Sequence, residues 1–543
     1  MKLQVLWSLV CLVALLREAN GFARPSIGGQ CQQSWKLRRY PRHERQSTGY
    51  QHGRQFSLQS VLRANQKDDD SQPDPDSASS SLDNPDDSSP LPWIFGLVVP
   101  LWLVYISNQW SRSSLYYLVD FSSDADPLLA MNVDVGFSEA QYGVLASLAF
   151  TSLFAFASLA AGIISDRFNR KTLTVAACLV WAIATLGTSF SQDYSQVLGW
   201  RVAMGLACAF ATPPAYTLIA QRVPKESVSL ASSLYGTGVA LGGAFASLSI
   251  LLDTSVGWRE ALVIIGIYGF VVAGVATILL PNDPKDTQPE ADTKFLVSKD
   301  TTTISTDESP VDAILADVQE ATASDRVKWL FLGSFLRFCS GLCIGVWSAP
   351  YFRMIFPDQQ SQYAVAQAAI TAVGGSVSGL LGGSLADKIS ANAEEEGDAD
   401  IYGRKLWIPV VGSALAAPAW YLAVENSQSF EVAMAWLATE YFVAECWFGP
   451  TISVLQKTVG PKIGGTSQGL FTLTGAVANV APSILGYMYG QATIGQEQSS
   501  TELAGLLVAG VCFCYVSCAF CFAMSALSGP PTSTTSAVEP TKQ

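Results

Sequence analysis

Histidine and charged residues are scarce in this sequence, and their scarcity excludes several classes of protein. Both histidines, His43 and His52, lie near the start, and Asp, Glu, Lys and Arg make up only 14% of the 543 residues. A soluble globular protein has roughly a quarter of such residues. The net charge is −13 and no basic stripe is available to contact phosphates, so we expect no nucleic-acid binding. The sequence also shows no nucleophile–base set, which argues against an enzyme.

The eleven cysteines suggest neither a disulfide framework nor a metal site. Cys512, Cys514, Cys518 and Cys521 lie close together, but residues two apart point to different sides of a helix. No histidine accompanies them, and their spacing differs from that of zinc sites. We interpret the cysteines of apolar stretches as small buried hydrophobic residues, and we expect no metal and no cofactor.

Long apolar stretches are what the sequence does contain. Each is about 20 residues long, the length that crosses roughly 30 Å of hydrocarbon as a helix. We therefore predict an all-α membrane protein with two six-helix bundles, at 91–280 and 328–528, joined by a polar loop at 281–327 and followed by a disordered tail at 529–543. A short helix is predicted in the loop, near Val311–Ala321. The predicted spans are 92–118, 141–163, 172–190, 195–220, 228–251, 260–280, 328–352, 362–386, 405–424, 430–453, 465–489 and 503–527.

The first 90 residues are interpreted as a targeting leader and a tether. Residues 1–21 have the basic start, apolar core and small-residue cleavage site of a signal peptide, and 22–67 are basic and poor in acids, as in a transit peptide. Residues 68–90 are acidic and read as a disordered linker. The junction around Phe22 resembles the bipartite presequences of algae with secondary plastids. That resemblance implies a plastid membrane. The alternative is an ordinary signal with a basic tail, which implies another secretory-pathway membrane.

The loops differ in charge between the two predicted sides of the membrane. One side holds ten Lys and Arg residues, whereas the other holds only Arg259 and Arg353 beside acids such as Asp120 and Asp134. Because basic residues stay on the side from which a protein is inserted, we predict that both termini and the central loop share the basic side. The ten residues are Arg167, Arg170, Lys171, Arg222, Lys225, Lys388, Arg404, Lys405, Lys457 and Lys462.

The most specific motif lies between the second and third spans. It comprises Gly162, Asp166, Arg167, Arg170 and Lys171, and it resembles the signature loop of the major facilitator superfamily. The resemblance implies the major facilitator fold, with this loop as a conformational switch. The alternative is an ordinary basic loop with incidental charges.

The second half of the chain repeats this motif after the eighth span. The repeat consists of Gly383, Asp387 and Lys388, and its basic end resumes at Arg404 after an acidic insert at 389–402. A second repeat links the segments that start at Pro214 and Pro450. Two repeats at corresponding places predict two pseudo-symmetric halves, and such transporters hold their substrate between the halves, near the midplane.

Charged residues inside the spans are the candidate binding residues, because a charge at bilayer depth is costly and is normally paired or lines a cavity. In the first span, Asn108 and Arg112 resemble part of the Asn-x-x-Asp-Arg of Spinster-like and anion:cation symporter proteins, with Ser111 in place of the Asp. Arg112 is a candidate to bind a carboxylate or phosphate. The alternative is a purely structural arginine.

Four further charges complete this set. Arg201 matches an arginine of the fourth span in the superfamily, and we hypothesise that it faces Glu440 of the tenth span as a pair or a gate. Glu445 and Arg337 are further candidates, although Arg337 could instead extend to the membrane interface. Since the spans contain no histidine, any proton coupling is expected at Glu440 or Glu445.

The sequence therefore predicts a secondary active transporter that moves a small anionic solute by alternating access. Its expected partners are the solute, H+ or Na+ as the coupling ion, and the lipid bilayer, and we expect a monomer. The alternatives are a Spinster-like lysolipid or sphingolipid carrier and a non-transporting sensor with the same fold.

Overall fold

The computed structural model describes residues 93–224, 227–281, 318–396, 400–459, 463–493 and 500–529. Within these ranges, the side chains of residues 159, 160, 162, 163, 166, 167, 229, 464 and 465 are not described. The predicted signal peptide, transit segment and acidic linker lie outside the described residues. So do 282–317 of the central loop and 530–543 of the tail.

The N-half begins at residue 94 and ends at residue 279. Several of its helices contain a π-helical or 3₁₀ turn, and these turns carry the label η. Its elements are η1 (Ile94–Val98), α3 (Val99–Ser113), η2 (Ser114–Tyr117), α4 (Met131–Val135), α5 (Glu139–Gly143), η3 (Val144–Leu148), α6 (Ala149–Arg167), α7 (Arg170–Ser189), α8 (Tyr194–Cys208), α9 (Thr212–Arg222), α10 (Val228–Gly236), α11 (Gly238–Val256) and α12 (Trp258–Leu279).

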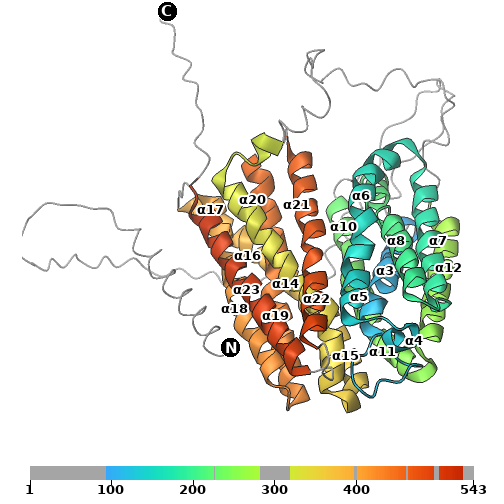
Figure 1. Cartoon of the computed structure of the whole chain (residues 1–543). Helices are drawn as coiled ribbons and strands as arrows, with labels where there is room; N and C mark the ends of the chain where they lie inside the picture. The colour runs from blue at the N-terminus through green and yellow to red at the C-terminus, as the bar shows by residue number, and fades with distance from the viewer. Residues whose placement is uncertain are drawn as a thin grey trace, which may run out of the picture. The chain divides into compact units, whose positions relative to one another are not determined.

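The C-half runs from residue 325 to residue 527 and is built in the same way (Figure 1). Its elements are α14 (Asp325–Ile355), η6 (Pro357–Gln359), α15 (Gln360–Ala369), η7 (Ile370–Gly375), α16 (Ser376–Glu395), α17 (Ile401–Lys405), α18 (Trp407–Glu425), α19 (Phe430–Ala444), η8 (Glu445–Trp447), α20 (Phe448–Val459), α21 (Gly464–Ala478), α22 (Val480–Ala492) and α23 (Ser500–Leu527).

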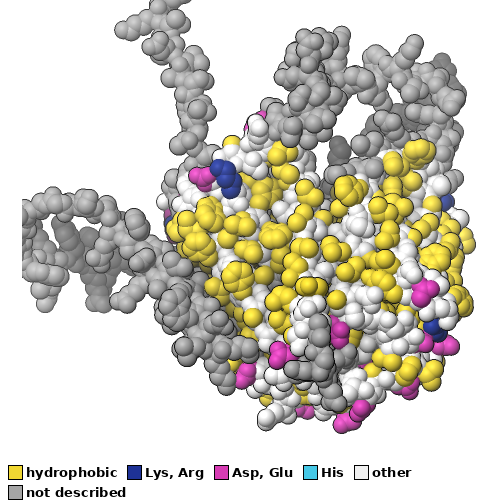
Figure 2. All heavy atoms as spheres, viewed as in Figure 1, with side chains coloured by type: hydrophobic (Ala, Val, Ile, Leu, Met, Phe, Trp, Pro, Cys, Tyr) yellow, Lys and Arg dark blue, Asp and Glu magenta, His cyan; other side chains and the backbone are white. Residues whose placement is uncertain are grey.

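A helix lies at each of the twelve predicted positions. In the part of the chain that the structure describes, eleven helices are long and apolar enough to cross a membrane. The tenth predicted span, 430–453, is present as α19 and α20 with η8 between them, but it is not among the eleven. It carries Glu431, Glu440 and Glu445, which lower its hydropathy. Figure 2 shows hydrophobic side chains over much of the face in view, with acidic side chains gathered toward its lower end.

Polar residues at the helix starts explain where several helices begin. The Ser138 side chain accepts a hydrogen bond from the Gln141 backbone N–H, and the Gln141 side-chain oxygen accepts one from the Ser138 backbone N–H, which forms a capping box ahead of α5. Asn169 caps α7 and Asp193 caps α8 through their side-chain oxygens. Each cap satisfies a backbone N–H that has no partner within its own helix.

The two halves are joined on one side, which we call the acidic side because the segment with Asp120, Asp124, Asp126 and Asp134 lies there. On this side α5 and η3 pack against α22, and α11 packs against α15 and η7 (Figure 1). The Tyr142 hydroxyl donates to the carbonyl of Val346 at 2.6 Å. The Oγ atoms of Ser147 and Ser483 are 2.6 Å apart.

The buried apolar side chains follow the same division. One cluster lies within the N-half, one lies within the C-half, and a third runs through both halves. In the third cluster the ring of Trp347 packs 4.9 Å from that of Tyr142 and 6.1 Å from that of Phe121, measured between ring centroids. Apolar packing and hydrogen bonds thus hold the halves together on the acidic side.

Two details differ from the sequence prediction. Residues 389–395 of the predicted acidic insert continue helix α16, which ends only at Glu395. Arg353 was counted among loop residues, but it lies in the last turn of α14 and is only 1% exposed. A buried arginine at a helix end needs acceptors, and the neighbouring half supplies them.

Candidate functional site

Arg201 on α8 is the central charge of the N-half. The residue is 2% exposed, and its guanidinium joins three elements. Nε donates to the carbonyl of Leu145 at 3.1 Å, and Nη1 donates to the carbonyl of Arg112 at 2.9 Å and contacts Met204 Sδ at 3.6 Å. Nη2 has no hydrogen-bond partner among the described residues. Backbone carbonyls satisfy part of the guanidinium and leave its charge without a carboxylate.

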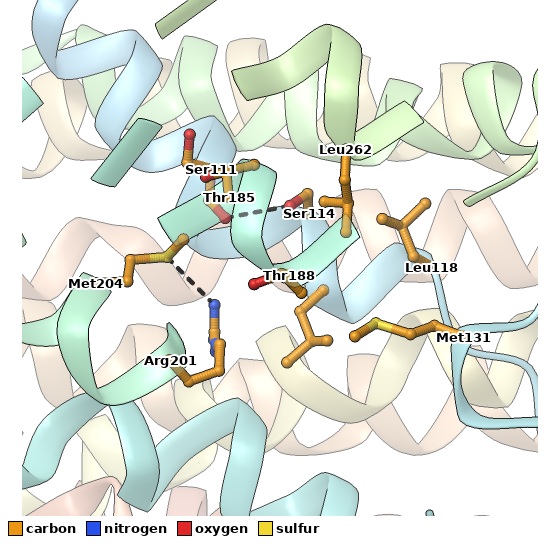
Figure 3. A pocket seen from close by; sticks show the side chains of 10 residues that line it. Ser111, Ser114, Leu118, Met131, Thr185, Thr188, Arg201, Met204 and Leu262 are labelled. Atoms are coloured by element: carbon orange, nitrogen blue, oxygen red, sulfur yellow. Dashed lines mark hydrogen bonds between the residues drawn. The ribbon is translucent and has the colours of Figure 1, made fainter. Parts of the chain in front are cut away.

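A small cavity of about 10 Å³ lies beside this guanidinium. Figure 3 shows Arg201 with Ser111, Thr185 and Thr188 around it. A volume of this size holds about one water molecule. The Ser111 hydroxyl is buried and makes no hydrogen bond within the described part of the chain. Ser111 therefore leaves polar space beside the arginine at the position where the resembled motif has an aspartate.

Arg112 adds a second positive charge next to Arg201. Its guanidinium carbon lies 4.8 Å from the centroid of the Phe150 ring, and that of Arg201 lies 5.7 Å from the same ring. The Arg112 side chain is half-buried and forms no ion pair with a described residue. Cations attract the face of an aromatic ring, so Phe150 holds both guanidinium groups close together without neutralising them.

Asn108 lies on the same face of α3, one turn before Ser111 and Arg112. It is 2% exposed, and its Nδ2 has no acceptor among the described residues. The Nε2 of Gln109 donates to its Oδ1 at 3.4 Å. The N-half thus presents an amide and two guanidinium groups whose hydrogen-bonding capacity is only partly used.

The C-half pairs its charges instead. Arg337 on α14 is 2% exposed, and its Nη2 donates to Glu445 Oε1 at 3.0 Å and to the carbonyl of Ala444 at 3.1 Å. The guanidinium carbon also lies 5.3 Å from the ring centroid of Tyr515 and 5.6 Å from that of Trp447. Arg337 is thus buried and paired rather than extended to the membrane interface.

Glu440 is buried and accepts a hydrogen bond from the hydroxyl of Tyr515. The predicted pairing of Glu440 with Arg201 does not occur in this structure, because each group has other partners. Glu440 remains a polar residue of the C-half, and Arg201 keeps its uncompensated charge.

The signature loop is described in part. The backbone of Gly162, Asp166 and Arg167 lies in the last turns of α6, but their side chains are outside the described residues. Arg170 begins α7, and its Nη1 donates to Gln221 Oε1 on α9 at 2.8 Å. Lys171 follows it in the same turn. The loop thus connects the basic ends of neighbouring helices in the N-half.

The repeat in the C-half is arranged differently. Gly383 faces Gly449, where α16 and α20 approach each other closely. Asp387 and Lys388 are exposed. Another ion pair of the C-half joins the buried Arg326 with the partly exposed Asp400, and its Nη1–Oδ1 distance is 2.8 Å.

A further polar cluster was not predicted from the sequence. Arg353 of the C-half contacts Asp120 and Asp253 of the N-half, together with two backbone carbonyls. We call these three side chains the Arg353 cluster. The sequence does place one acid near the end of each of two spans and one arginine at the end of a third. This pattern could have indicated the Arg353 cluster.

In the described part of the chain, helices at the twelve predicted positions form two halves that are joined at one side and carry buried charges. This arrangement defines a polytopic membrane protein with the architecture of a transporter. The Major Facilitator Superfamily model matches residues 101–483, and the chain belongs to this superfamily. It is a family of transporters and not of enzymes.

Curated relatives support the same conclusion. An MFS-type efflux pump of Mycolicibacterium smegmatis is 24% identical over 405 residues, which cover 70% of this chain and 84% of that protein. The probable sulfoacetate transporter SauU of Cupriavidus necator is 24% identical over 67% of this chain and 82% of its own length. The 4-hydroxybenzoate transporter PcaK of Pseudomonas aeruginosa is 28% identical over 186 residues. That match spans 33% of this chain and 41% of the relative.

Solved structures share the fold. A bacterial homolog of the human lysosomal transporter Spinster, in an inward-facing and unoccupied conformation, matches with a TM-score of 0.61 and 19% identity. The match covers 80% of this chain and 96% of that one. The nucleoside transporter NupG matches with a TM-score of 0.57 and 15% identity, over 79% of this chain and 98% of the other. At these identities the likeness concerns the fold.

Proposed function

We propose that this protein is a secondary active transporter that binds a small organic anion at Arg112 and Arg201 and moves it by alternating access. The main observation behind this proposal is the pair of guanidinium groups beside Phe150. Neither has a carboxylate partner among the described residues. An unpaired charge at bilayer depth is costly unless a ligand or water compensates it. An anionic ligand compensates both charges at once.

The difference between the halves supports an anion rather than a cation. Arg337 of the C-half is already paired with Glu445, whereas the two arginines of the N-half have no carboxylate partner among the described residues. Ser111 contributes no negative charge where the resembled motif has an aspartate. The relatives named for 4-hydroxybenzoate and sulfoacetate are named for organic anions, which agrees with this sign.

The test is uptake into liposomes that contain the purified protein. We expect saturable uptake of labelled 4-hydroxybenzoate or sulfoacetate, and Arg112→Gln should raise the KM at least tenfold. A hydrogen bond to a charged group is worth about 1.5–3 kcal/mol, and 1.4 kcal/mol corresponds to tenfold. Lys328→Gln is the matched control, because it removes an exposed cation that pairs only with Asp325, three residues away.

The same assay separates the alternatives. Movement of a labelled lysolipid that is indifferent to Arg112→Gln, without anion uptake, would replace the anion proposal with the lipid carrier. Absence of any uptake, together with binding of a soluble partner, would favour the sensor.

We further propose that the leader directs the protein to a plastid membrane. The basic, acid-poor composition of residues 22–67 behind a signal-like start supports this. Residues 1–67 fused to a fluorescent protein should accumulate in the plastid of an alga with a secondary plastid. Accumulation elsewhere in the secretory pathway would contradict plastid targeting.

A further inference from the structure

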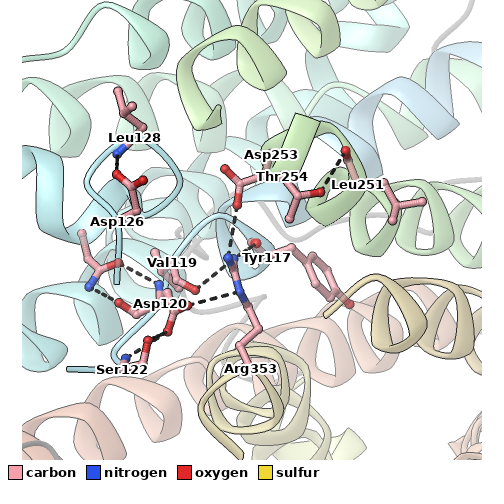
Figure 4. Close-up of polar contacts among 11 residues, drawn as sticks. Tyr117, Val119, Asp120, Ser122, Asp126, Leu128, Leu251, Asp253, Thr254 and Arg353 are labelled. Carbon is pink, nitrogen blue, oxygen red and sulfur yellow. Dashed lines mark hydrogen bonds and ion pairs between the residues drawn. The ribbon is translucent and has the colours of Figure 1, made fainter. Parts of the chain in front are cut away.

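The Arg353 cluster holds the two halves together at a single side chain. Arg353 Nη1 donates to the carbonyls of Tyr117 at 2.6 Å and Val119 at 3.3 Å, and Nη2 donates to Asp253 Oδ2 at 3.2 Å. Its Nε lies 3.8 Å from Asp120 Oδ2. Figure 4 shows the guanidinium between these groups. The arginine comes from α14 of the C-half, and all of these partners belong to the N-half.

The cluster contains one more negative charge than positive charges. Two carboxylates share one guanidinium, and the three side chains are between 0% and 8% exposed. Burial of an uncompensated carboxylate is costly, and proteins commonly avoid the cost by protonating the group. Closure of the acidic side therefore buries an excess negative charge unless a proton is taken up.

The two carboxylates are not equivalent. Asp120 Oδ1 accepts hydrogen bonds from the backbone N–H of Ser122 at 2.9 Å and from its hydroxyl at 2.8 Å, which stabilise the ionised form. Asp253 Oδ2 contacts Arg353, but Oδ1 is buried without a hydrogen-bond partner among the described residues. Of the two acids, Asp253 is the less well stabilised as an anion.

Among the described residues, Arg353 is the cation that forms an ion pair with Asp253. The elements packed against α11 are α3, α10, α12, α15, η2 and η7, and the charged residues described on them are Arg112 on α3 and Arg259 and Glu260 on α12. The charged residue in hydrogen-bond contact with Asp253 is Arg353, whereas Arg259 pairs with Asp134.

We propose that the Arg353 cluster is a proton-binding site that controls closure of the acidic side. As the halves close, Asp253 takes one H+ from the aqueous phase on that side, forming an O–H bond. The cluster then carries Arg353 and Asp120 as a neutral pair. As the halves open, water reaches Asp253 and the proton leaves. This inference does not depend on which solute is carried.

The effect of pH on closure has a defined direction. Because the closed state binds the proton more tightly than the open state, acidification favours closure of the acidic side. One proton changes the ratio of closed to open protein by at most about tenfold per pH unit. The prediction is independent of transport and can be measured without a substrate.

The test uses the Ser147–Ser483 contact, whose Oγ atoms lie 2.6 Å apart across the halves. In the Ser147→Cys, Ser483→Cys double variant, an oxidant should form a disulfide when the acidic side is closed. A protease site inserted in 282–317 lets a non-reducing gel separate linked from unlinked halves. The two single variants control for linkage to native cysteines.

We expect the linked fraction to rise as the pH falls from about 8 to about 6, relative to the same protein with Asp253→Asn. Thiol oxidation itself depends on pH, because only thiolates react. The Asp253→Asn protein carries the same two introduced cysteines, so this dependence cancels in the comparison. Asp253→Asn should remain closed throughout. Asp124 is an exposed acid of the segment that contains Asp120. The Asp124→Asn variant should show the same pH dependence of the linked fraction as the parent protein.

The same pH profile in the parent and in Asp253→Asn would overturn the proposal. Arg353→Gln should reduce the linked fraction at every pH, and Arg353→Lys should restore part of it. Full linkage in Arg353→Gln would show that the arginine does not hold the halves. If Arg353→Gln fails to fold, the comparison of the parent with Asp253→Asn still decides the question.

Discussion

The two halves of this transporter share a fold but treat their buried arginines differently. In the N-half, Arg112 and Arg201 meet at the ring of Phe150 without a carboxylate partner among the described residues. In the C-half, Arg337 is paired with Glu445, and Glu440 accepts a hydrogen bond from Tyr515. Similar helices can therefore supply either a binding charge or a structural ion pair. The difference lies in whether an acid faces the arginine.

The largest effect on anion binding is expected from a substitution that introduces an acid beside the arginines of the N-half. Ser111→Asp places a carboxylate in the cavity beside Arg201 and close to Arg112. We expect the KM for an organic anion to rise by about 10- to 100-fold, since charged hydrogen bonds of about 1.5–3 kcal/mol would be taken by the new acid. Uptake measurements in liposomes test this.

Thermal stability is the control for that variant. It should be unchanged or higher, because the new acid compensates buried positive charge. Unchanged anion uptake in Ser111→Asp would mean that these two arginines do not form the binding site.

Close helix packing at Phe150 gives the second effect. A Cβ atom added at Gly205 would overlap the carbonyl oxygen of Phe150, so Gly205→Ala should destabilise the protein by about 1–3 kcal/mol. Gly199→Ala in the same helix has no atom within 4 Å of its Cβ and should be neutral or slightly stabilising. Melting temperatures in detergent compare the two variants.

A glycine at a close helix contact can be replaced in the C-half in the same way. A Cβ atom at Gly412 would lie 2.6 Å from the carbonyl oxygen of Val443, and Gly412→Ala should lower the melting temperature to a similar extent. A large effect in only one half would show that the halves differ in packing as well as in charge.

Breaking the ion pair of the C-half should affect stability more than binding. Arg337→Gln removes the partner of Glu445 and should cost about 1–2 kcal/mol, toward the low end for a charged hydrogen bond because Glu445 is 40% exposed. The melting temperature should fall while the KM changes little. A rise in KM as large as that of Arg112→Gln would place Arg337 in the binding site.

The smallest effect is expected at Glu440. Glu440→Gln keeps an acceptor for the Tyr515 hydroxyl, so uptake driven by the solute gradient alone should change by less than about threefold. Uptake driven by a pH gradient is the second measurement. Loss of only the pH-driven component would assign proton coupling to Glu440, one of the two carboxylates that the sequence predicts for it, and not to the Arg353 cluster alone.

Much of the fold could be predicted because each span is an uninterrupted apolar stretch of the length that crosses a bilayer. A helix lies at every predicted position. The continuous helix formed by η1, α3 and η2 lies within about two residues of its predicted bounds, as do α7 and α12. The interruption at Glu445–Trp447 has no comparable signal. The ring of Trp447 there packs against Phe338, Phe448, Phe471 and Phe522, and no local pattern encodes these contacts.

The charged residues could be predicted, but their partners could not. Arg337 and Glu445 are 108 residues apart in the chain, and Arg353 and Asp253 are 100 apart. A one-dimensional pattern shows that each is costly to bury, yet it does not show which helix faces it. For the same reason Arg353 was interpreted as a loop residue, although its surroundings are the interior of the protein.

The backbone carbonyls that Arg353 contacts have a consequence for mutational tolerance. Arg353 donates two of its hydrogen bonds to the backbone carbonyls of Tyr117 and Val119. A substitution changes the side chain but leaves the backbone carbonyl in place. Substitutions at these two positions should therefore leave the contacts in place, provided that the turn keeps its path. A mutational scan for loss of closure should report Arg353 and pass over Tyr117 and Val119, although all three lie in the same contact.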